Sequence, residues 1–339
     1  MFSKIKTHLF GEEAIVVSGI SAFDLGAIME CGQCFRHQRL AGGSSEAYTA
    51  ASGEICAAPR RPGADEDYVE YMTVVKDRLF FFGQRKPGEL IVFHCSDEDF
   101  DNIVAPFFAL NMDYDGIKAE ILSAARSEFI ERAAECAGGV RILSQDPWEA
   151  LFSFIISQNN NIPRIRKIIR SICAAYGENA AQAQGLTVCP MSGEDMDENK
   201  CSACGRCYTF PTAEAVLKSP ELLLPSKPGF RYKYLLDCCE KVTRGEVDLV
   251  KIKEKASYEY TLGELKKILG VGDKVASCAA LFGFENYEAF PIDVWMKRAI
   301  DVYFGGKLDI EALGRYRGIT QQYIFHYIRN LEEKNSDLQ

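Results

Sequence analysis

The chain has 339 residues, of which 47% are apolar and 26% charged, as is typical of a globular protein with about two domains. The longest run dominated by apolar residues, 103–112, is too short to cross a bilayer as a helix. The first residues lack the apolar core of a secretory signal. We therefore expect a cytoplasmic or nuclear protein that is neither secreted nor embedded in a membrane, with most of its 13 cysteines reduced.

Charge is distributed unevenly along the chain. The net charge is −9, yet residues 1–115 carry 10 Lys and Arg against 18 Asp and Glu, a net charge of −8. Residues 116–339 carry 29 against 30, a net charge of −1. Because a polyanion responds to the local field and not to the total charge, a basic face is expected in the second part.

The first hundred residues have the pattern of β-strands. β-Branched and aromatic residues dominate 15–17, 68–75, 79–82 and 90–93, and the polar residues 76–78 favour a hairpin. A helix is expected at 25–31, and loops at 42–45 and 59–67. We interpret residues 1–115 as an antiparallel, β-rich domain.

From about residue 99 the apolar residues follow a helical period. Asp146 can cap a helix that begins with Pro147 and carries Glu149 in its first turn. Further helices are predicted at 162–176, 230–242, 262–269, 274–281, 294–303 and 319–331. The predicted fold class is therefore α+β, with the β-rich N-terminal domain packed on a mostly helical body at 116–339.

A polar stretch at about 178–210 interrupts the helical pattern, and we interpret it as an inserted loop. It contains four cysteines, Cys189, Cys201, Cys204 and Cys207, in the spacing C-x11-C-x2-C-x2-C. Four thiolates in this spacing could hold a tetrahedral structural zinc ion. Free thiols in a loop are the alternative.

Gly270 and Gly272 lie one residue apart between two predicted helices. Such glycines permit a tight turn whose backbone N–H groups, at the start of the second helix, suit a phosphate oxygen. A dinucleotide-binding motif would need a preceding strand and a third glycine, and both are missing here. A plain corner between two helices is the alternative.

Lys274 lies in the first turn of the second helix, and Asp293 begins another helix 19 residues later. The helix dipole disfavours a cation at this end, so we expect a lowered Lys274 pKa and a neutral, nucleophilic amine. The alternative is an ordinary exposed lysine. Asp293 is expected to be an N-cap that, in the same cleft, also acts electrostatically on that amine.

Together these residues resemble the helix-hairpin-helix and Gly/Pro–Asp signature of base-excision DNA glycosylases. A second set, at 32–35, 144–147, 151–165, 229–232 and 316–325, is similar to the 8-oxoguanine DNA glycosylase/AP lyase family. The resemblance covers most of the chain apart from the cysteine-bearing stretch. The chain departs from the family at Leu269, where the hairpin usually carries proline, and at Trp295, where a phosphate-binding histidine is common.

The resemblance implies roles in binding a base that has left the duplex. Gln321 and Phe325 would bind the extruded guanine, and Cys278 would cover its other face. The backbone carbonyl of Gly32 would accept the N7 hydrogen that only the oxidised base carries. The implied DNA-binding residues are Asn159, Arg164 and Arg231 around the orphaned cytosine, Phe230 as a wedge, and Gly270 and Gly272.

The implied partner is double-stranded DNA that contains oxidised guanine, and the implied reaction requires no cofactor. Neutral Lys274 would attack C1′ of the deoxyribose while Asp293 stabilises the cationic sugar, and the Schiff base would then allow β-elimination 3′ to the lesion. We expect a preference for cytosine opposite the lesion and a monomeric protein. The alternatives are a related glycosylase for another lesion and a non-catalytic, zinc-containing DNA-binding module.

Overall fold

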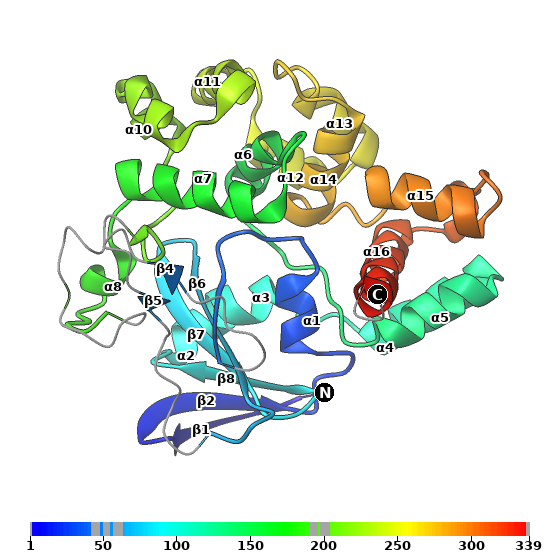
Figure 1. Cartoon of the computed structure of the whole chain (residues 1–339), viewed down its shortest axis with the longest axis horizontal. Helices are drawn as coiled ribbons and strands as arrows, with labels where there is room; N and C mark the ends of the chain where they lie inside the picture. The colour runs from blue at the N-terminus through cyan, green and yellow to red at the C-terminus, as the bar shows by residue number, and fades with distance from the viewer. Residues whose placement is uncertain are drawn as a thin grey trace.

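The computed structural model describes residues 2–41, 48–49, 55–56, 64–189, 196 and 204–336. Figure 1 shows an antiparallel sheet at the lower left, with helices packed above it and to its right. The predicted α+β class is confirmed, because all six strands of this sheet precede residue 94 and helices dominate the rest. The loop expected at 42–45 lies outside the described residues.

Six strands form the main sheet, and each is antiparallel to its neighbours. Their spatial order is β1 (Ser3–Leu9), β2 (Glu12–Ser18), β8 (Glu89–Phe93), β7 (Arg78–Gln84), β6 (Val69–Val75) and β3 (Gln38–Ala41). A separate pair joins β4 (Tyr48–Thr49) to β5 (Ile55–Cys56). The predicted hairpin at 76–78 is confirmed, with a left-handed Lys76 (φ 56°) in the turn between β6 and β7.

The remaining elements are mostly helices, and α7 and α15 have the predicted bounds. In chain order they are α1 (Leu25–Glu30), α2 (Asp97–Asp99), a π-helical turn (Phe100–Val104), α3 (Ala105–Phe107), α4 (Tyr114–Ala125), α5 (Glu128–Cys136), α6 (Pro147–Ser157), α7 (Ile162–Tyr176), α8 (Ala180–Ala183), α10 (Ala213–Lys218), 3₁₀ turns at Pro220–Ser226 and Gly229–Arg231, α11 (Tyr232–Thr243), α12 (Leu249–Lys255), α13 (Tyr258–Leu265), α14 (Asp273–Gly283), α15 (Val294–Tyr303), a 3₁₀ turn at Glu311–Leu313 and α16 (Arg317–Ser336). Among the described residues, none of these helices combines the length and apolar composition needed to cross a membrane.

The start of α6 has the predicted cap. Asp146 accepts a hydrogen bond from the backbone N–H of Glu149 at 3.0 Å, and Pro147 occupies the first helical position. The Glu149 side chain turns inward and pairs with Arg36 at 2.8 Å. Burial raises the pKa of the Glu149 carboxyl above its ordinary value. This pair ties the helical body to the segment that follows α1.

Arg141 is fully buried and joins the N-terminal part to the helical body. Its Nη1 donates to the carbonyl oxygen of Ala109 at 2.7 Å. Its Nη2 and Nε donate to the carbonyl oxygens of Ser21 (2.7 Å) and Ala22 (3.1 Å). The guanidinium also lies 4.4 Å from the ring centroid of Tyr114. A buried charge with such partners fixes the two parts relative to each other.

Helix α14, which carries Lys274, is locked against α6. The two helices approach so closely that a Cβ on Gly283 would lie 2.9 Å from the Cβ of Ala150. Both helices contribute to one large apolar core, which also includes residues of α5, α7, α11 and α16. The side chains that α14 presents are therefore held on a rigid support.

The inserted stretch covers one face of the sheet. Gln184, just after α8, accepts a hydrogen bond from the Leu79 N–H at 2.6 Å and donates to the Leu79 carbonyl at 3.1 Å. Cys207 is buried in a small core on this face, and Cys189 and Cys204 pack against it. In its described residues the insert is therefore a packed element.

Candidate active site

One pocket contains all six residues that the resemblance implies in catalysis and base binding. It lies between α14, α16 and the segment after α1. Its lining consists of Cys31, Gly32, Phe154, Lys274, Cys278, Phe282, Pro291, Asp293, Gln321, Gln322 and Phe325. In the sequence the six implied residues are up to 293 positions apart, from Gly32 to Phe325.

Lys274 is partly buried in the first turn of α14, beside two aromatic rings. Its Nζ lies 5.7 Å from the ring centroid of Phe154. That ring stacks on Phe282, with centroids 5.4 Å apart and an angle of 18° between the planes. Lys274 thus lies in the first turn of α14, with its amine over the face of an aromatic ring.

Cys278 lies one helical turn beyond Lys274 and is buried. Burial raises the pKa of its thiol to about 11, an effect that the Lys274 ammonium opposes and the Asp293 carboxylate reinforces. A thiol with this pKa is protonated at neutral pH and is a poor nucleophile. Cys278 is therefore suited to a packing role in this pocket.

Asp293 is the N-cap of α15, as predicted. Its Oδ1 accepts a hydrogen bond from the backbone N–H of Met296 at 2.8 Å. This bond fixes the carboxylate on the wall of the pocket that Lys274 also lines. A fixed carboxylate beside a reacting centre stabilises positive charge that develops there.

Gly32 has a left-handed backbone, with φ of 80°. A Cβ at this position would lie 3.5 Å from Cε1 of Phe325, which is an ordinary contact. The free protein therefore requires glycine for its backbone conformation and not for lack of space.

Gln33 holds this backbone in place and had no role assigned from the sequence. Its side chain is fully buried. Nε2 donates to the carbonyl oxygen of Arg141 at 2.8 Å, and Oε1 accepts from the N–H of Leu143 at 2.7 Å. Gln145 donates to the Gln33 carbonyl at 2.7 Å. The sequence showed only a polar residue directly after Gly32.

Gln321 has an unpaired acceptor in the pocket. The residue is 4% exposed, and its Oε1 has no hydrogen-bond partner among the described residues. A buried acceptor without a partner costs about 1–3 kcal/mol, so a ligand with an N–H group would regain that energy. Phe325 lies one turn further along α16 and presents its ring to the same pocket.

The three residues implied in binding the orphaned cytosine lie together, but they differ in exposure. Asn159 is exposed with a left-handed backbone (φ 47°), and Arg164 is also exposed. Arg231 is 3% exposed and donates to the carbonyl oxygens of Gln158 and Asn159, the latter at 2.9 Å. Burial, together with the nearby Arg164 charge, lowers the Arg231 pKa. In the free protein Arg231 thus connects the 3₁₀ turn before α11 to the residues that follow α6.

Phe230 precedes Arg231 and is exposed. Its side chain is 49% exposed and its ring lies 4.4 Å from the Arg231 guanidinium. An exposed aromatic ring fixed beside basic residues suits a wedge between base steps.

The two hairpin glycines differ in what they require. Gly270 has φ of 78°, and a Cβ there would lie 2.5 Å from the ring of Tyr234. A Cβ on Gly272 would meet nothing within 4 Å. Packing therefore accounts for glycine at 270, whereas the space at 272 is open to a ligand.

The zinc hypothesis concerns residues that the structure describes only in part. Cys201 lies outside the described residues. Within the described ranges, no group of three or more His, Cys, Asp and Glu has the arrangement of a metal site.

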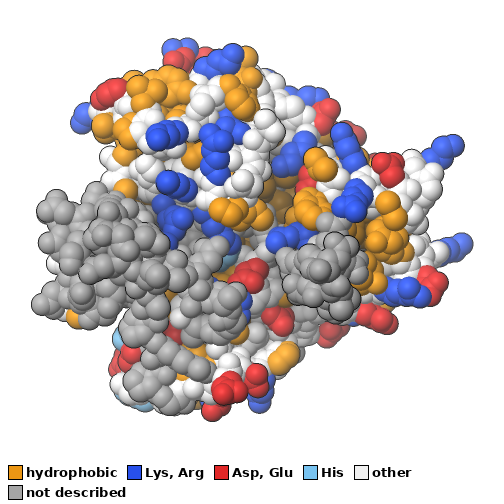
Figure 2. Space-filling model, viewed as in Figure 1, with side chains coloured by type: hydrophobic (Ala, Val, Ile, Leu, Met, Phe, Trp, Pro, Cys, Tyr) orange, Lys and Arg blue, Asp and Glu red, His pale blue; other side chains and the backbone are white. Residues whose placement is uncertain are grey.

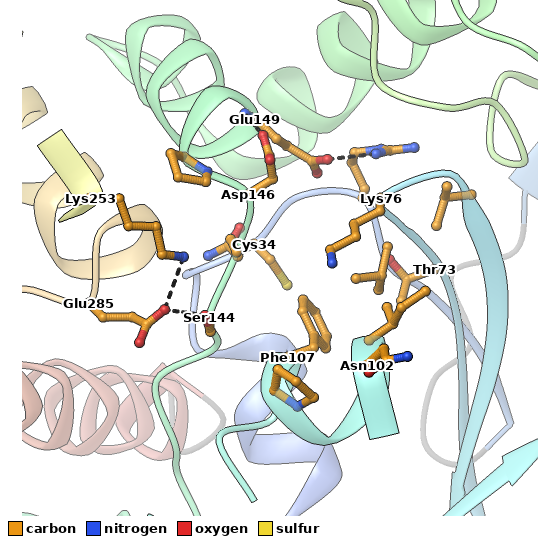
Figure 3. Close-up of a pocket in the computed structure, with 17 residues that line it drawn as sticks. Cys34, Thr73, Lys76, Asn102, Phe107, Ser144, Asp146, Glu149, Lys253 and Glu285 are labelled. Atoms are coloured by element: carbon orange, nitrogen blue, oxygen red, sulfur yellow. Dashed lines mark hydrogen bonds and ion pairs between the residues drawn. The ribbon is translucent and has the colours of Figure 1, made fainter. Parts of the chain in front are cut away.

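A second cavity, of about 230 Å³, lies between β6, the start of α6 and the segment after α1 (Figure 3). Cys34 lines it, whereas Gly32 lines the first pocket. Lys253 and Ser144 both bind Glu285, at 3.2 and 2.6 Å, and Glu149 is held by Arg36. Four of its charged groups thus form two ion pairs, and neither Lys274 nor Asp293 lines it.

Charge on the drawn face of the molecule follows the sequence expectation. In Figure 2 Lys and Arg side chains gather over the helical part at the top, and Asp and Glu over the lower part. The lower part is where Figure 1 places the sheet. A polyanion would therefore be drawn to the helical side.

Comparison with known proteins agrees with this geometry. Residues 15–151 match the family model of the 8-oxoguanine DNA glycosylase N-terminal domain. The N-glycosylase/DNA lyase of Saccharomyces cerevisiae is 31% identical over 171 residues, which is 47% of this chain and 40% of that protein. The chain thus spans less than half the length of this curated relative.

Solved structures match over almost the whole chain. MBOgg1 in complex with a low-affinity DNA ligand is 30% identical, with a TM-score of 0.74 over 98% of this chain and 99% of that one. The Clostridium acetobutylicum 8-oxoguanine glycosylase/lyase, bound to double-stranded DNA with cytosine opposite 8-oxoguanine, is 28% identical, with a TM-score of 0.72 over 98% of both chains. The chain therefore belongs to the 8-oxoguanine DNA glycosylase family.

Proposed function

We propose that the protein is a bifunctional DNA glycosylase and AP lyase that removes 8-oxoguanine from duplex DNA in base-excision repair. The observation that carries this proposal is the single pocket that holds Lys274, Asp293 and the unpaired acceptor of Gln321. The relatives named N-glycosylase/DNA lyase and 8-oxoguanine glycosylase/lyase support the same reaction.

The reaction proceeds from the neutral amine of Lys274. Its Nζ forms a bond to C1′ of the deoxyribose while the bond from C1′ to N9 of the base breaks, and the base leaves with the electron pair. Asp293 stabilises the positive charge that develops on the sugar. Opening of the sugar ring, with transfer of a proton from nitrogen to O4′, gives the Schiff base. Loss of the C2′ proton then expels O3′ and cuts the strand 3′ to the lesion. This route requires no cofactor.

Recognition uses the rest of the pocket. An extruded guanine stacks on Phe325, and its polar edge supplies the N–H group that the Gln321 oxygen lacks. The carbonyl of Gly32 accepts the N7 hydrogen of the oxidised base. Unmodified guanine has an acceptor at N7, so the same contact would place two acceptors against each other.

Borohydride trapping tests the proposal. The full chain is incubated with a duplex that contains one 8-oxoguanine opposite cytosine, and the imine is reduced as it forms. We expect a covalent protein–DNA adduct, and we expect Lys274→Gln to abolish it. Lys266→Gln is the matched control, because Lys266 lies at the same hairpin but binds Asp273 at 2.6 Å and does not line the pocket.

Three results would be decisive against the proposal. An adduct that survives Lys274→Gln would remove this lysine from the reaction. An adduct only with a duplex that carries another lesion would identify a related glycosylase. No adduct with any damaged duplex, despite DNA binding, would favour a non-catalytic DNA-binding module.

A further inference from the structure

One face of α11 holds the hairpin turn between α13 and α14. Tyr234, Asp237 and Lys241 follow one another at intervals of three and four residues, so they share this face. Each contacts a different part of the turn at 266–270. The turn thus depends on side chains from a helix that lies about 30 positions earlier in the sequence.

Asp237 binds the backbone of the turn. Its Oδ2 accepts a hydrogen bond from the N–H of Leu269 at 2.6 Å. The same oxygen lies 3.0 Å from Nζ of Lys241. Lys241 in turn donates to the carbonyl oxygen of Lys267 at 2.6 Å, just beyond the end of α13. An N–H and a C=O of the turn are therefore both held by one ion pair.

Tyr234 holds the next residue of the turn. Its ring lies where a side chain on Gly270 would be, 2.5 Å from the ideal Cβ position. The same ring meets Phe230 edge-on, with centroids 5.9 Å apart. The Tyr234 ring thus lies between the exposed Phe230 ring, in the 3₁₀ turn before α11, and the hairpin.

A carboxylate at this position is electrostatically unfavourable for a DNA-binding turn. Its charge repels phosphate, and among the described residues Lys241 is its only ion-pair partner. By its field alone, Asp237 would weaken the binding of a duplex. Any favourable effect of Asp237 on DNA affinity must therefore come from its bond to the turn.

We propose that Asp237 is a positioning residue, which fixes the hairpin in the conformation that offers the N–H groups around Gly270 and Gly272 to a DNA phosphate. The proposal rests on the proposed function, because it assumes that the hairpin binds DNA. A turn with two glycines has many accessible conformations when it is not held. Ordering it only upon binding would lower the affinity, and the Asp237 bond orders it beforehand.

Duplex affinity in a double-mutant cycle tests the proposal. Fluorescence anisotropy measures the binding of a labelled, undamaged duplex by the wild type, Asp237→Ala, Leu269→Pro and the double variant. Leu269→Pro removes the N–H donor. We expect Asp237→Ala to weaken binding about five-fold, the effect of one modest hydrogen bond. In the Leu269→Pro background we expect no further loss from Asp237→Ala, because its partner is already gone.

Two further variants separate positioning from charge and from folding. Asp237→Asn keeps an acceptor oxygen for the Leu269 N–H, and we expect it to bind within about two-fold of the wild type. Glu240→Ala removes a carboxylate from an exposed site on the same helix, where it contacts Arg244, and we expect no loss of affinity. Base release at saturating enzyme should proceed at the wild-type rate in Asp237→Ala, since only docking is affected.

The outcomes distinguish this inference from the proposed function. If Asp237→Ala binds as tightly as the wild type or more tightly, the field of the carboxylate outweighs its bond and the inference is wrong. An equal loss in both Leu269 backgrounds also overturns it, because the effect then does not pass through this N–H. Failure of the wild type itself to bind the duplex or to release 8-oxoguanine would instead remove the proposed function.

Discussion

Gln322 donates a hydrogen bond from Nε2 to the backbone carbonyl oxygen of Cys31 at 2.8 Å, across 291 positions of the sequence. Both residues are buried, so no water replaces this bond readily. The bond fixes the peptide that immediately precedes Gly32 against α16, the helix that carries Gln321 and Phe325. Gln322, which has no assigned role in base binding, therefore fixes the position of the Gly32 segment relative to α16.

The first prediction concerns this bond. Gln322→Ala leaves the Cys31 carbonyl without its partner, and we expect a loss of about 1–3 kcal/mol in the free energy of unfolding. The preference for 8-oxoguanine over guanine should fall about ten-fold, because the Gly32 carbonyl is no longer held at a fixed distance from α16. Single-turnover base release on the two duplexes measures the preference. Asn330→Ala, two turns along the same helix, is the control, and an unchanged ratio in Gln322→Ala would contradict the prediction.

A second prediction separates the two arginines near Asn159. Arg164 is exposed, so Arg164→Ala should reduce the preference for cytosine opposite the lesion and leave thermal stability unchanged. Arg231→Ala removes several hydrogen bonds from a buried guanidinium to backbone carbonyl oxygens and should cost about 2–4 kcal/mol of stability as well. Base release opposite each of the four bases, with thermal unfolding of each variant, provides the test. Equal stability of the two variants would refute the structural role of Arg231.

Local signals in the sequence predicted where Lys274 and Asp293 lie in the fold. Lys274 and Asp293 each stand at the start of a helix, and such starts have clear signatures of glycine, proline and capping residues. That the two would share a pocket with Gln321 came from the family resemblance, since no local pattern reports a contact across α14 and α16.

Other features depend on tertiary contacts that a sequence pattern does not contain. Strand β1 was not predicted, because it lies at the edge of the sheet with most of its side chains exposed and shows no alternation. Helix α13 ends at Leu265 and not at 269, since α11 holds the residues that follow in a turn. The burial of Arg231 likewise depends on carbonyl groups more than 70 positions away.

The third prediction follows from the burial of His37. Its Nε2 accepts from Arg166 at 2.5 Å and its Nδ1 lies 3.3 Å from the Cys34 sulfur, with the ring edge-on to Tyr71. Burial, and then the Arg166 charge, lower the His37 pKa well below its ordinary value. Below a pH of about 6.5 the unfolded chain takes up a proton that the folded protein does not. Stability should therefore fall as the pH falls through this region.

Urea unfolding of the wild type and of His37→Gln between pH 8 and pH 5 measures this effect. The unfolding free energy of the wild type minus that of His37→Gln should be constant above about pH 7.5. Below about pH 6.5 this difference should decrease by up to about 1.4 kcal/mol per pH unit, because only the wild type loses stability through protonation of His37 in the unfolded chain. His8→Gln, at an exposed position of β1, is the control and should run parallel to the wild type. If the curve of His37→Gln also runs parallel to that of the wild type, His37 takes up its proton over the same pH range in the folded and the unfolded protein, and the prediction is wrong.

The last prediction contrasts the two hairpin glycines. Gly270→Ala places a methyl group into the Tyr234 ring and strains a left-handed backbone, so it should lower stability by about 2–4 kcal/mol and disturb the turn even without DNA. Gly272→Ala meets nothing within 4 Å and should fold with wild-type stability. If Gly272 lies against a phosphate, its added methyl group should nevertheless weaken duplex binding about ten-fold. Thermal unfolding and duplex affinity, measured together on both variants, separate strain within the protein from contact with DNA. Wild-type affinity in Gly272→Ala would place the phosphate elsewhere on the hairpin.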